Sequence, residues 1–255
     1  MTPKTAVITG GAGGLGQALD KRLRAQGWAT VLVDLPGPET DRLERLRDRK
    51  VFACDLTDAQ AMDTVCGQIR NQSPSIDLVI YNAGITCIGP FSVLSDDAHR
   101  KVFEINYFAA VNMARALQAD IRAAKGAHLA ISSVAGFTPL RHRTAYAASK
   151  HALEGFFKSL RSEEKGHGVR CVIAAPSFVA TNLGNPDTRP DGTARPGSAP
   201  DGVDYMSPEQ AADVILAGLA RGRNFIPVGR IARLSWLIYR FSPSIFETLM
   251  ERRIR

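Results

Sequence analysis

The stretch Thr5-Ala-Val-Ile-Thr-Gly-Gly-Ala-Gly-Gly-Leu-Gly16 decides the fold of this 255-residue chain. Its short apolar run predicts a buried strand, and five glycines follow within residues 10–16. A helix-like stretch containing Ala18, Leu19 and Leu23 comes next. A strand, a glycine turn and a helix in this order are typical of a dinucleotide-binding turn, where the N–H groups of the helix N-terminus receive a pyrophosphate.

An acidic residue, Asp34, ends the next apolar run, eighteen residues after Gly16. A carboxylate at this point can accept hydrogen bonds from the ribose hydroxyls of an adenosine. It would repel a 2′-phosphate, and no Lys or Arg lies within residues 10–16 or directly after Asp34 to offset the repulsion. The sequence therefore predicts NAD in preference to NADP, and the plainer alternative is that Asp34 caps a turn.

Strand-like and helix-like stretches alternate along the chain. Apolar runs predict strands at residues 5–9, 30–34, 51–54, 78–81, 128–132, 169–175 and 224–228. Regular alternation favours a Rossmann-type, doubly wound α/β fold: a parallel sheet of about seven strands with helices on both faces. We expect one dinucleotide-binding and catalytic domain over residues 1–229, followed by a basic amphipathic helical tail over residues 230–255.

A tyrosine and a lysine four residues apart, Tyr146 and Lys150, give the chain its most specific chemical signal. On a helix this spacing places both side chains on one face, one turn apart. A neighbouring ammonium lowers the pKa of a phenol from its usual value of about 10, so Tyr146 could exchange a proton near neutral pH. Ser133 lies thirteen residues upstream, at the end of an apolar run. Together the three residues predict a proton-transfer site rather than an ordinary surface helix.

These motifs, in this order, resemble those of the short-chain dehydrogenase/reductase family from Lys4 to about Val228. The resemblance implies a catalytic tetrad of Asn106, Ser133, Tyr146 and Lys150, in which Asn106 holds a water that links Lys150 to solvent. It also implies a set of cofactor-binding residues: Gly10, Gly14, Leu15, Gly16, Asp34, Leu35, Asp55, Leu56, Asn82, Ala83, Gly84, Tyr146, Lys150, Pro176, Val179 and Thr181.

The chain departs from the family pattern at Ser177, where a Gly is usual, and at Tyr81, where an Asn is common. Neither position carries a proton-transfer group. Ser132 is a rival to Ser133 for the catalytic hydroxyl. The family's spacing to Tyr146 favours Ser133, and adjacent residues of a strand face opposite ways.

The tetrad implies an NAD(P)-dependent oxidoreductase that interconverts a secondary alcohol and a ketone by hydride transfer. Tyr146 would be the acid in carbonyl reduction and the base in alcohol oxidation, while Ser133 would hydrogen-bond the substrate oxygen. We expect an alcohol dehydrogenase or ketone reductase that prefers NAD(H). The alternative is a non-catalytic NAD-binding sensor on the same fold, although a sensor has no physical need for the complete tetrad.

Composition and cysteine usage are those of an ordinary globular chain, with 45% hydrophobic and 22% charged residues. The four cysteines and five histidines show no metal-ligand spacing, so we expect reduced thiols, no metal and a cytoplasmic protein. The apolar, helix-like stretches Val102–Leu117 and Ala152–Leu160 match the helices that pair in family dimers, which implies a homodimer or homotetramer. No nucleic-acid recognition motif is present, so we expect no nucleic-acid partner.

A Pro- and Gly-rich segment, residues 183–206, follows the expected nicotinamide-binding residues. Its length and placement favour a substrate lid over a solvated insertion. The segment Phe137–Arg143 joins the Ser133 run to the Tyr146 helix, and its apolar residues predict a hydrophobic, lipid-like or polycyclic substrate. Arg141 and Arg143 could contact an anionic group instead, but arginines beside a loop are more often solvated.

The tail carries most of the net charge, because residues 221–255 have a net charge of +6 and residues 1–220 a net charge of +1. On a helical wheel, one apolar face lies beside a cluster of arginines. The face comprises Ile231, Leu234, Leu237, Ile238 and Phe241, and the arginines are Arg230, Arg233 and Arg240. Three interpretations stay open: contact with an anionic membrane surface, packing on the body or on another subunit, and a wall of the substrate pocket.

Overall fold

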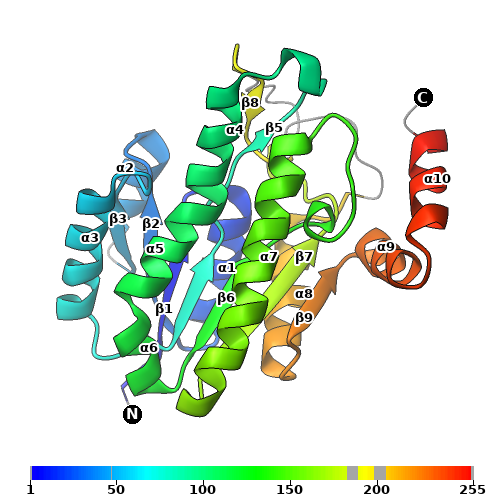
Figure 1. Ribbon diagram of the computed structural model, residues 1–255. Helices are drawn as coiled ribbons and strands as arrows, with labels where there is room; N and C mark the ends of the chain where they lie inside the picture. The colour runs from blue at the N-terminus through cyan, green and yellow to red at the C-terminus, as the bar shows by residue number, and fades with distance from the viewer. Residues whose placement is uncertain (1, 47, 183–188, 198–204, 254–255) are drawn as a thin grey trace.

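The computed structural model describes residues 2–46, 48–182, 189–197 and 205–253. Within them, the central layer is a seven-stranded parallel sheet in the order β3-β2-β1-β4-β6-β7-β9 (Figure 1). Its strands are β1 Thr5–Thr9, β2 Ala29–Asp34, β3 Lys50–Ala53, β4 Leu78–Tyr81, β6 Ala127–Ile131, β7 Arg170–Pro176 and β9 Phe225–Val228. The strand order reverses between β1 and β4, which is where an open α/β sheet forms a ligand crevice at the carboxyl ends of its strands.

The sheet is covered on both faces, so its strands are continuous apolar runs. Every residue of β1 and β6 is buried. Neighbouring residues of one strand belong to different cores: Val7 packs with Val79 on one side, whereas Ile8 packs with Leu32 and Ile80 on the other. This alternation follows from the pleat, and it makes both faces necessary to the fold.

Helices form a layer on each side of the sheet (Figure 1). One core contains residues of α3 (Ala59–Gln72), α5 (Ala109–Ala116), α6 (Gln118–Ala124) and α7 (Thr144–Glu164). The other contains residues of α1 (Gly14–Ala25), α2 (Pro38–Glu44) and α8 (Pro208–Ala220). Helix α4 (Asp96–Phe103) runs into α5 through the π-helical turn η2 (Glu104–Phe108).

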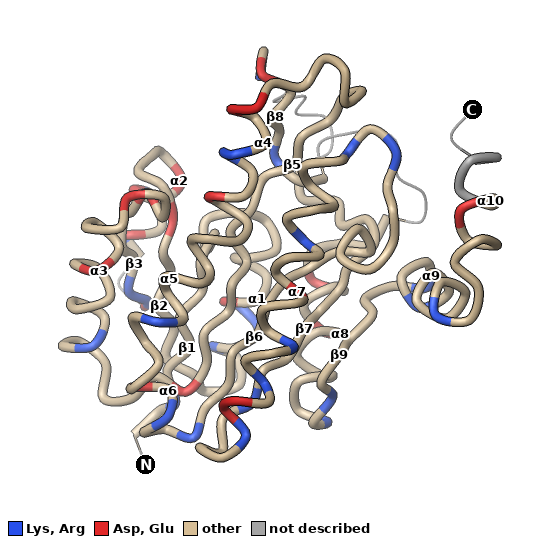
Figure 2. Tube along the Cα trace, in the orientation of Figure 1, with Lys and Arg blue, Asp and Glu red and all other residues tan. Residues whose placement is uncertain are grey.

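The tail forms two helices, α9 (Arg230–Phe241) and α10 (Pro243–Arg253), at one edge of the molecule. All the charged positions of α9 are basic (Figure 2). Among the described residues, no helix is both long enough and apolar enough to cross a membrane.

The predicted fold class is confirmed, and each predicted strand lies within one residue of an observed one. A second, antiparallel sheet of β5 (Thr86–Cys87) and β8 (Thr193–Ala194) was not predicted, because two residues show no periodicity. Strand β8 lies inside the segment expected to be a lid. Residues 183–188 and 198–204 of that segment lie outside the described residues.

Candidate active site

The glycine turn connects β1 to α1 at the carboxyl edge of the sheet. Gly10 has a φ of +63°, and a Cβ there would lie 2.9 Å from the Cα of Ala83. A Cβ on Gly16 would lie 2.2 Å from the carbonyl oxygen of Gly10. The Asn82 side-chain amide donates to the carbonyls of Thr9 (3.1 Å) and Gly10 (2.9 Å). The turn is therefore locked against the end of β4 and has no room for side chains at these glycines.

The N-terminus of α1 is suited to a phosphate group. Its capping residue, Gly13, provides no side-chain hydrogen bond, and the first turn contains no acidic residue. The first N–H groups of a helix have no partner within it and carry partial positive charge. A Cβ on Gly14 would lie 3.3 Å from the side chain of Thr181, so this end of the helix also meets the segment after β7. These donors and this close backbone approach fit the pyrophosphate of a dinucleotide.

Asp34 lies at the end of β2, directly against the turn. Its Oδ2 accepts a hydrogen bond from the Ala12 backbone at 2.7 Å, and its Oδ1 accepts one from the Leu35 backbone at 2.8 Å. These bonds fix the carboxylate at the carboxyl edge, where the sequence analysis places the adenosine ribose.

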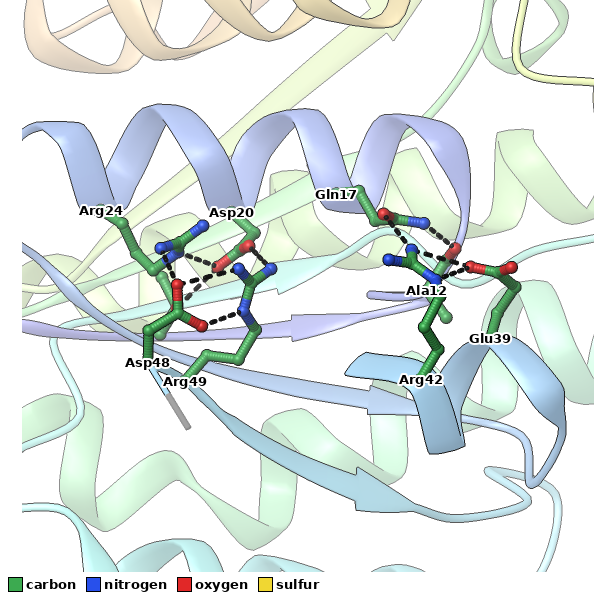
Figure 3. Close-up of polar contacts among 9 residues, drawn as sticks. Ala12, Gln17, Asp20, Arg24, Glu39, Arg42, Asp48 and Arg49 are labelled. Carbon is green, nitrogen blue, oxygen red and sulfur yellow. Dashed lines mark hydrogen bonds and ion pairs between the residues drawn. The ribbon is translucent and has the colours of Figure 1, made fainter. Parts of the chain in front are cut away.

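A cation that no sequence motif marks, Arg42, lies beside Gln17 near the glycine turn. Gln17 donates to the Ala12 carbonyl at 2.7 Å and accepts from Arg42 at 3.1 Å (Figure 3). The same guanidinium is paired with Glu39 at 2.9 Å. Arg42 lies eight residues beyond Asp34, and only the return of α2 towards α1 brings it near the turn. Both side chains of this pair are more than half exposed, so the pair is weak.

The other residues expected to contact the cofactor follow the carboxyl ends of parallel strands, so the structure gathers them at one edge of the sheet. Asp55 and Leu56 follow β3, Asn82 to Gly84 follow β4, and Pro176 ends β7, with Val179 and Thr181 shortly after it. The Thr181 hydroxyl donates to the Pro196 carbonyl at 2.9 Å, which ties the segment after β7 to the described part of the expected lid.

Ser133, Tyr146 and Lys150 meet where β6 passes to α7. The Ser133 hydroxyl accepts from the Ala135 backbone at 3.2 Å and lies close enough to the Tyr146 phenol to act on its pKa. The Lys150 ammonium lies 5.8 Å from the centroid of the Tyr146 ring and donates to the Ile131 carbonyl at 2.9 Å. This is the juxtaposition that the spacing of the three residues predicts.

Ser132 points to a different environment. Its hydroxyl is buried and donates to Glu154 at 2.8 Å, a carboxylate that also pairs with Lys158. The geometry therefore favours Ser133 as the hydroxyl next to Tyr146.

Asn106 lies in the π-helical turn η2, a type of distortion that is frequent at functional sites. Its side-chain oxygen accepts from the Ile85 backbone at 2.8 Å, and its amide donates to the Ile85 carbonyl and to Ser149, each at 2.9 Å. A Cβ on Gly84 would lie 3.1 Å from the Asn106 oxygen and 3.5 Å from the Lys150 nitrogen. The Asn106 side chain thus links the segment after β4 to α7, beside Lys150.

Burial dominates the proton equilibria of the site. It raises the pKa of Tyr146, although the Ser133 hydrogen bond and the positive charge of Arg143 both act to lower it. Burial also lowers the pKa of Lys150 to about 8, against the opposing effect of Glu154. The expectation that Lys150 would leave Tyr146 with a lowered pKa is therefore wrong in direction. A four-residue spacing indicates a neighbour but not the extent of desolvation.

Arg143 was expected to be solvated, and that expectation is wrong. Its side chain is only 8% exposed, three residues before Tyr146 at the start of α7. It donates to the Thr86 hydroxyl at 3.0 Å, because β5 passes over this end of the helix. Arg141 is exposed, as expected.

A line of aromatic rings connects the segment after Ser133 with the tail. Phe137 meets Phe225 of β9 edge to face at a centroid distance of 5.8 Å, and Phe225 stacks with Trp236 of α9 at 5.8 Å. The tail is therefore anchored on the side of the molecule that carries the loop between Ser133 and Tyr146.

Comparisons with known proteins agree with this geometry. The family model for short chain dehydrogenases matches residues 4–191. Dehydrogenase/reductase SDR family member 7B of Bos taurus is 32% identical over 265 aligned residues, which cover 98% of this chain and 81% of that protein. The 1-deoxy-11-beta-hydroxypentalenate dehydrogenase of Streptomyces avermitilis is 34% identical over 238 residues, which cover 89% of this chain and 84% of that protein.

Solved structures share the fold over nearly the whole chain. A short-chain dehydrogenase from Streptomyces avermitilis superposes with a TM-score of 0.83 at 23% identity, covering 99% of this chain and 97% of that one. A short-chain dehydrogenase from Burkholderia cenocepacia, solved in complex with NADP, superposes with a TM-score of 0.80 at 21% identity, with 98% of each chain covered.

Proposed function

The chain belongs to the short-chain dehydrogenase/reductase family of oxidoreductases, and from this premise we propose that it interconverts a secondary alcohol and a ketone with NAD(H). The proposal rests on one observation: Ser133, Tyr146 and Lys150 lie together at the carboxyl edge that carries the glycine turn. A nicotinamide cofactor supplies the hydride chemistry, while the protein positions the groups and moves the proton.

Tyr146 is the proposed acid and base. With its pKa raised by burial, the phenol is protonated at neutral pH, which suits donation to a carbonyl that is being reduced. In alcohol oxidation the phenolate takes the proton, and the positive charges of Arg143 and Lys150 favour it. The Ser133 hydroxyl lies beside the Tyr146 phenol, so it is placed to bond the same substrate oxygen and to stabilise the charge that develops there.

The preference for NAD(H) over NADP(H) is supported by two features at the end of β2. The Asp34 carboxylate is fixed by the Ala12 and Leu35 backbones, and the nearby Arg42 is paired with Glu39. A 2′-phosphate there would meet the Asp34 carboxylate and, paired with Arg42, the Glu39 carboxylate. We expect NADH to bind at least about tenfold more tightly than NADPH, because like charges brought together cost several kcal/mol.

Fluorescence titration of both reduced cofactors tests this preference. Asp34→Ala should narrow the difference in affinity between NADH and NADPH, because it removes the carboxylate that repels the 2′-phosphate. Glu39→Gln should strengthen NADPH binding by leaving the Arg42 charge unpaired. Asp41→Asn, on the same helix, serves as a charge-matched control. Tighter binding of NADPH than of NADH by the unmodified protein would overturn the assignment.

A hydrophobic substrate, lipid-like or polycyclic, is part of the proposal. It is supported by the apolar side chains after Ser133 and by the aromatic line from Phe137 through Phe225 to Trp236. The Streptomyces avermitilis relative is named for a hydroxypentalenate.

The decisive experiment is a screen of alcohols and ketones with both cofactors, followed by Tyr146→Phe on any substrate found. The variant keeps the ring but loses the transferable proton, so turnover should fall by about 100- to 10,000-fold while NADH binding persists. Tyr107→Phe removes a hydroxyl from an aromatic cluster outside the site and should leave turnover unchanged. Near-normal turnover by Tyr146→Phe would refute the mechanism. Tight NADH binding without turnover of any compound would favour a cofactor sensor instead.

A further inference from the structure

Helix α9 turns three of its large apolar side chains away from the described part of the protein. Ala232 and Ser235, on its inner side, are 0% and 7% exposed. Leu234, Leu237 and Phe241 are 58%, 47% and 83% exposed. Burial of such side chains is favourable, so a helix that served only to cover the body would turn them inward. Among the described residues, the body of the chain therefore does not cover these three side chains.

Helix α10 also carries exposed apolar side chains. Ile245 and Leu249 are 56% and 49% exposed, while Phe246 is buried and meets the Tyr239 ring edge to face at 5.6 Å. That ring contact holds the two helices together at the edge of the molecule, outside both helical layers (Figure 1). We call Leu234, Leu237, Phe241, Ile245 and Leu249 the tail patch.

Positive charge accompanies the tail patch. Arg230, Arg233 and Arg240 are all exposed on α9, and the helix contains no acidic residue (Figure 2). Arg240 lies 5.4 Å from the Trp236 ring. On α10 the exposed Glu247 lies two residues from both Ile245 and Leu249, which on a helix places it on the opposite side from them.

The charge decides between the two occupants that could cover the tail patch. In a two-fold contact between copies, the same surface meets itself, so the arginines of one α9 would approach those of the other. An anionic lipid surface offers the opposite charge together with an apolar layer below it, and an apolar helix face flanked by arginines and aromatic rings is typical of interfacial helices.

We propose that the tail patch docks this protein on an anionic lipid membrane. Its apolar side chains enter the headgroup layer, and Arg230, Arg233 and Arg240 contact lipid phosphates. The docking is independent of the proposed reaction, because it requires neither cofactor nor substrate.

Sedimentation of the full chain with vesicles tests the proposal. We expect binding to phosphatidylcholine–phosphatidylserine vesicles, weaker binding to pure phosphatidylcholine, and release as salt screens the arginines. Leu234→Ser/Leu237→Ser/Phe241→Ser should abolish binding without loss of NADH affinity, since exposed side chains are changed. Arg233→Ala/Arg240→Ala should weaken binding roughly 25-fold, at roughly fivefold for each arginine. Arg221→Ala/Arg223→Ala removes the same charge from exposed positions outside α9 and should retain binding.

Three results would overturn the proposal. The first is no binding of the unmodified protein to anionic vesicles. The second is vesicle binding that survives the triple serine substitution. The third is a loss of oligomer mass in the triple variant, measured by light scattering, with no vesicle binding by either protein; that result would assign the tail patch to a second copy of this chain.

Discussion

Acid should destabilise this fold through one buried histidine, His128 of β6. The side chain is 0% exposed, and its Nδ1 lies 2.7 Å from the Tyr81 hydroxyl. Its Nε2 has no hydrogen-bond partner among the described residues. Protonation would place a charged N–H in an apolar core between the rings of Tyr81 and Phe157. Burial accordingly lowers the pKa of His128 from 6.5 to about 4, against the opposing charge of Glu164.

The sign and size of the effect follow from proton linkage. Above pH 6.5 the ring is neutral in both states, so His128 adds no pH dependence. Between pH 6.5 and about 4 the unfolded chain binds a proton that the folded chain excludes, so the free energy of unfolding falls as the pH falls. Between pH 7 and pH 5 this contribution removes about 2 kcal/mol.

The measurement compares the protein with His128→Phe by urea denaturation at pH 7 and pH 5, at one protein concentration. The variant keeps an aromatic ring but leaves the Tyr81 hydroxyl without its partner, so it should be less stable at pH 7. The deficit should shrink by about 2 kcal/mol at pH 5, because only the unmodified protein must exclude a proton. Tyr81→Phe/His128→Phe should give the same change without the orphaned hydroxyl. A stability difference that is constant with pH would refute the reasoning.

Two further predictions concern the site. Arg143→Met should move the pH profile of alcohol oxidation to higher pH, because the positive charge that it removes lowers the pKa of Tyr146. Arg143→Lys should restore the profile. Arg141→Met, at an exposed position, should leave it unchanged. An unshifted profile would show that Arg143 has no influence on Tyr146. Lys150→Met should be inactive, yet it should be no less stable than the unmodified protein at pH 7. In the unmodified protein, burying the charged ammonium, with its pKa near 8, costs about 3 kcal/mol. In the variant, the Ile131 carbonyl loses its donor, which costs about 1–3 kcal/mol. In the unmodified protein, the folded chain loses the Lys150 proton near pH 8 and the unfolded chain loses it near pH 10.5, so its free energy of unfolding should rise between these pH values. The free energy of unfolding of the variant should therefore fall relative to that of the unmodified protein across this range in urea denaturation. A difference that stays constant with pH would contradict the prediction.

The fold was predictable because its determinants are local. Each strand of a doubly covered sheet is an unbroken apolar run, and the glycines after β1 stand within seven residues of one another in the sequence. The pair of Tyr146 and Lys150 was predictable for the same reason, since its spacing is a property of one helix, whereas Asn106 was assigned to the proposed tetrad only through the family resemblance. Some strand ends differ from the prediction by one residue. For example, β6 was predicted at residues 128–132 and is observed at Ala127–Ile131.

The parts that could not be predicted depend on contacts between segments distant in sequence. Arg42 reaches the glycine turn only because α2 packs beside α1, and Arg143 is buried only because β5 passes over the start of α7. The rise of the Tyr146 pKa above its usual value could not be predicted either. A neighbouring charge can be inferred from spacing, but desolvation depends on everything that surrounds the phenol.

On the tail helix α9, hydrophobicity predicts which residues form an apolar face but not which side of the helix packs on the body. The helical wheel predicts an apolar face and a basic flank on α9, and both exist, but hydrophobicity alone directs that face towards the core. The observed orientation follows from size: Ala232 and Ser235 are small and lie three residues apart, which lets the helix approach β9 closely while Trp236 stacks on Phe225. Turning Leu234 and Leu237 inward would move the helix axis outward and break that stacking. On this helix the small residues determine the packed side, so Leu234, Leu237 and Phe241 stay exposed among the described residues.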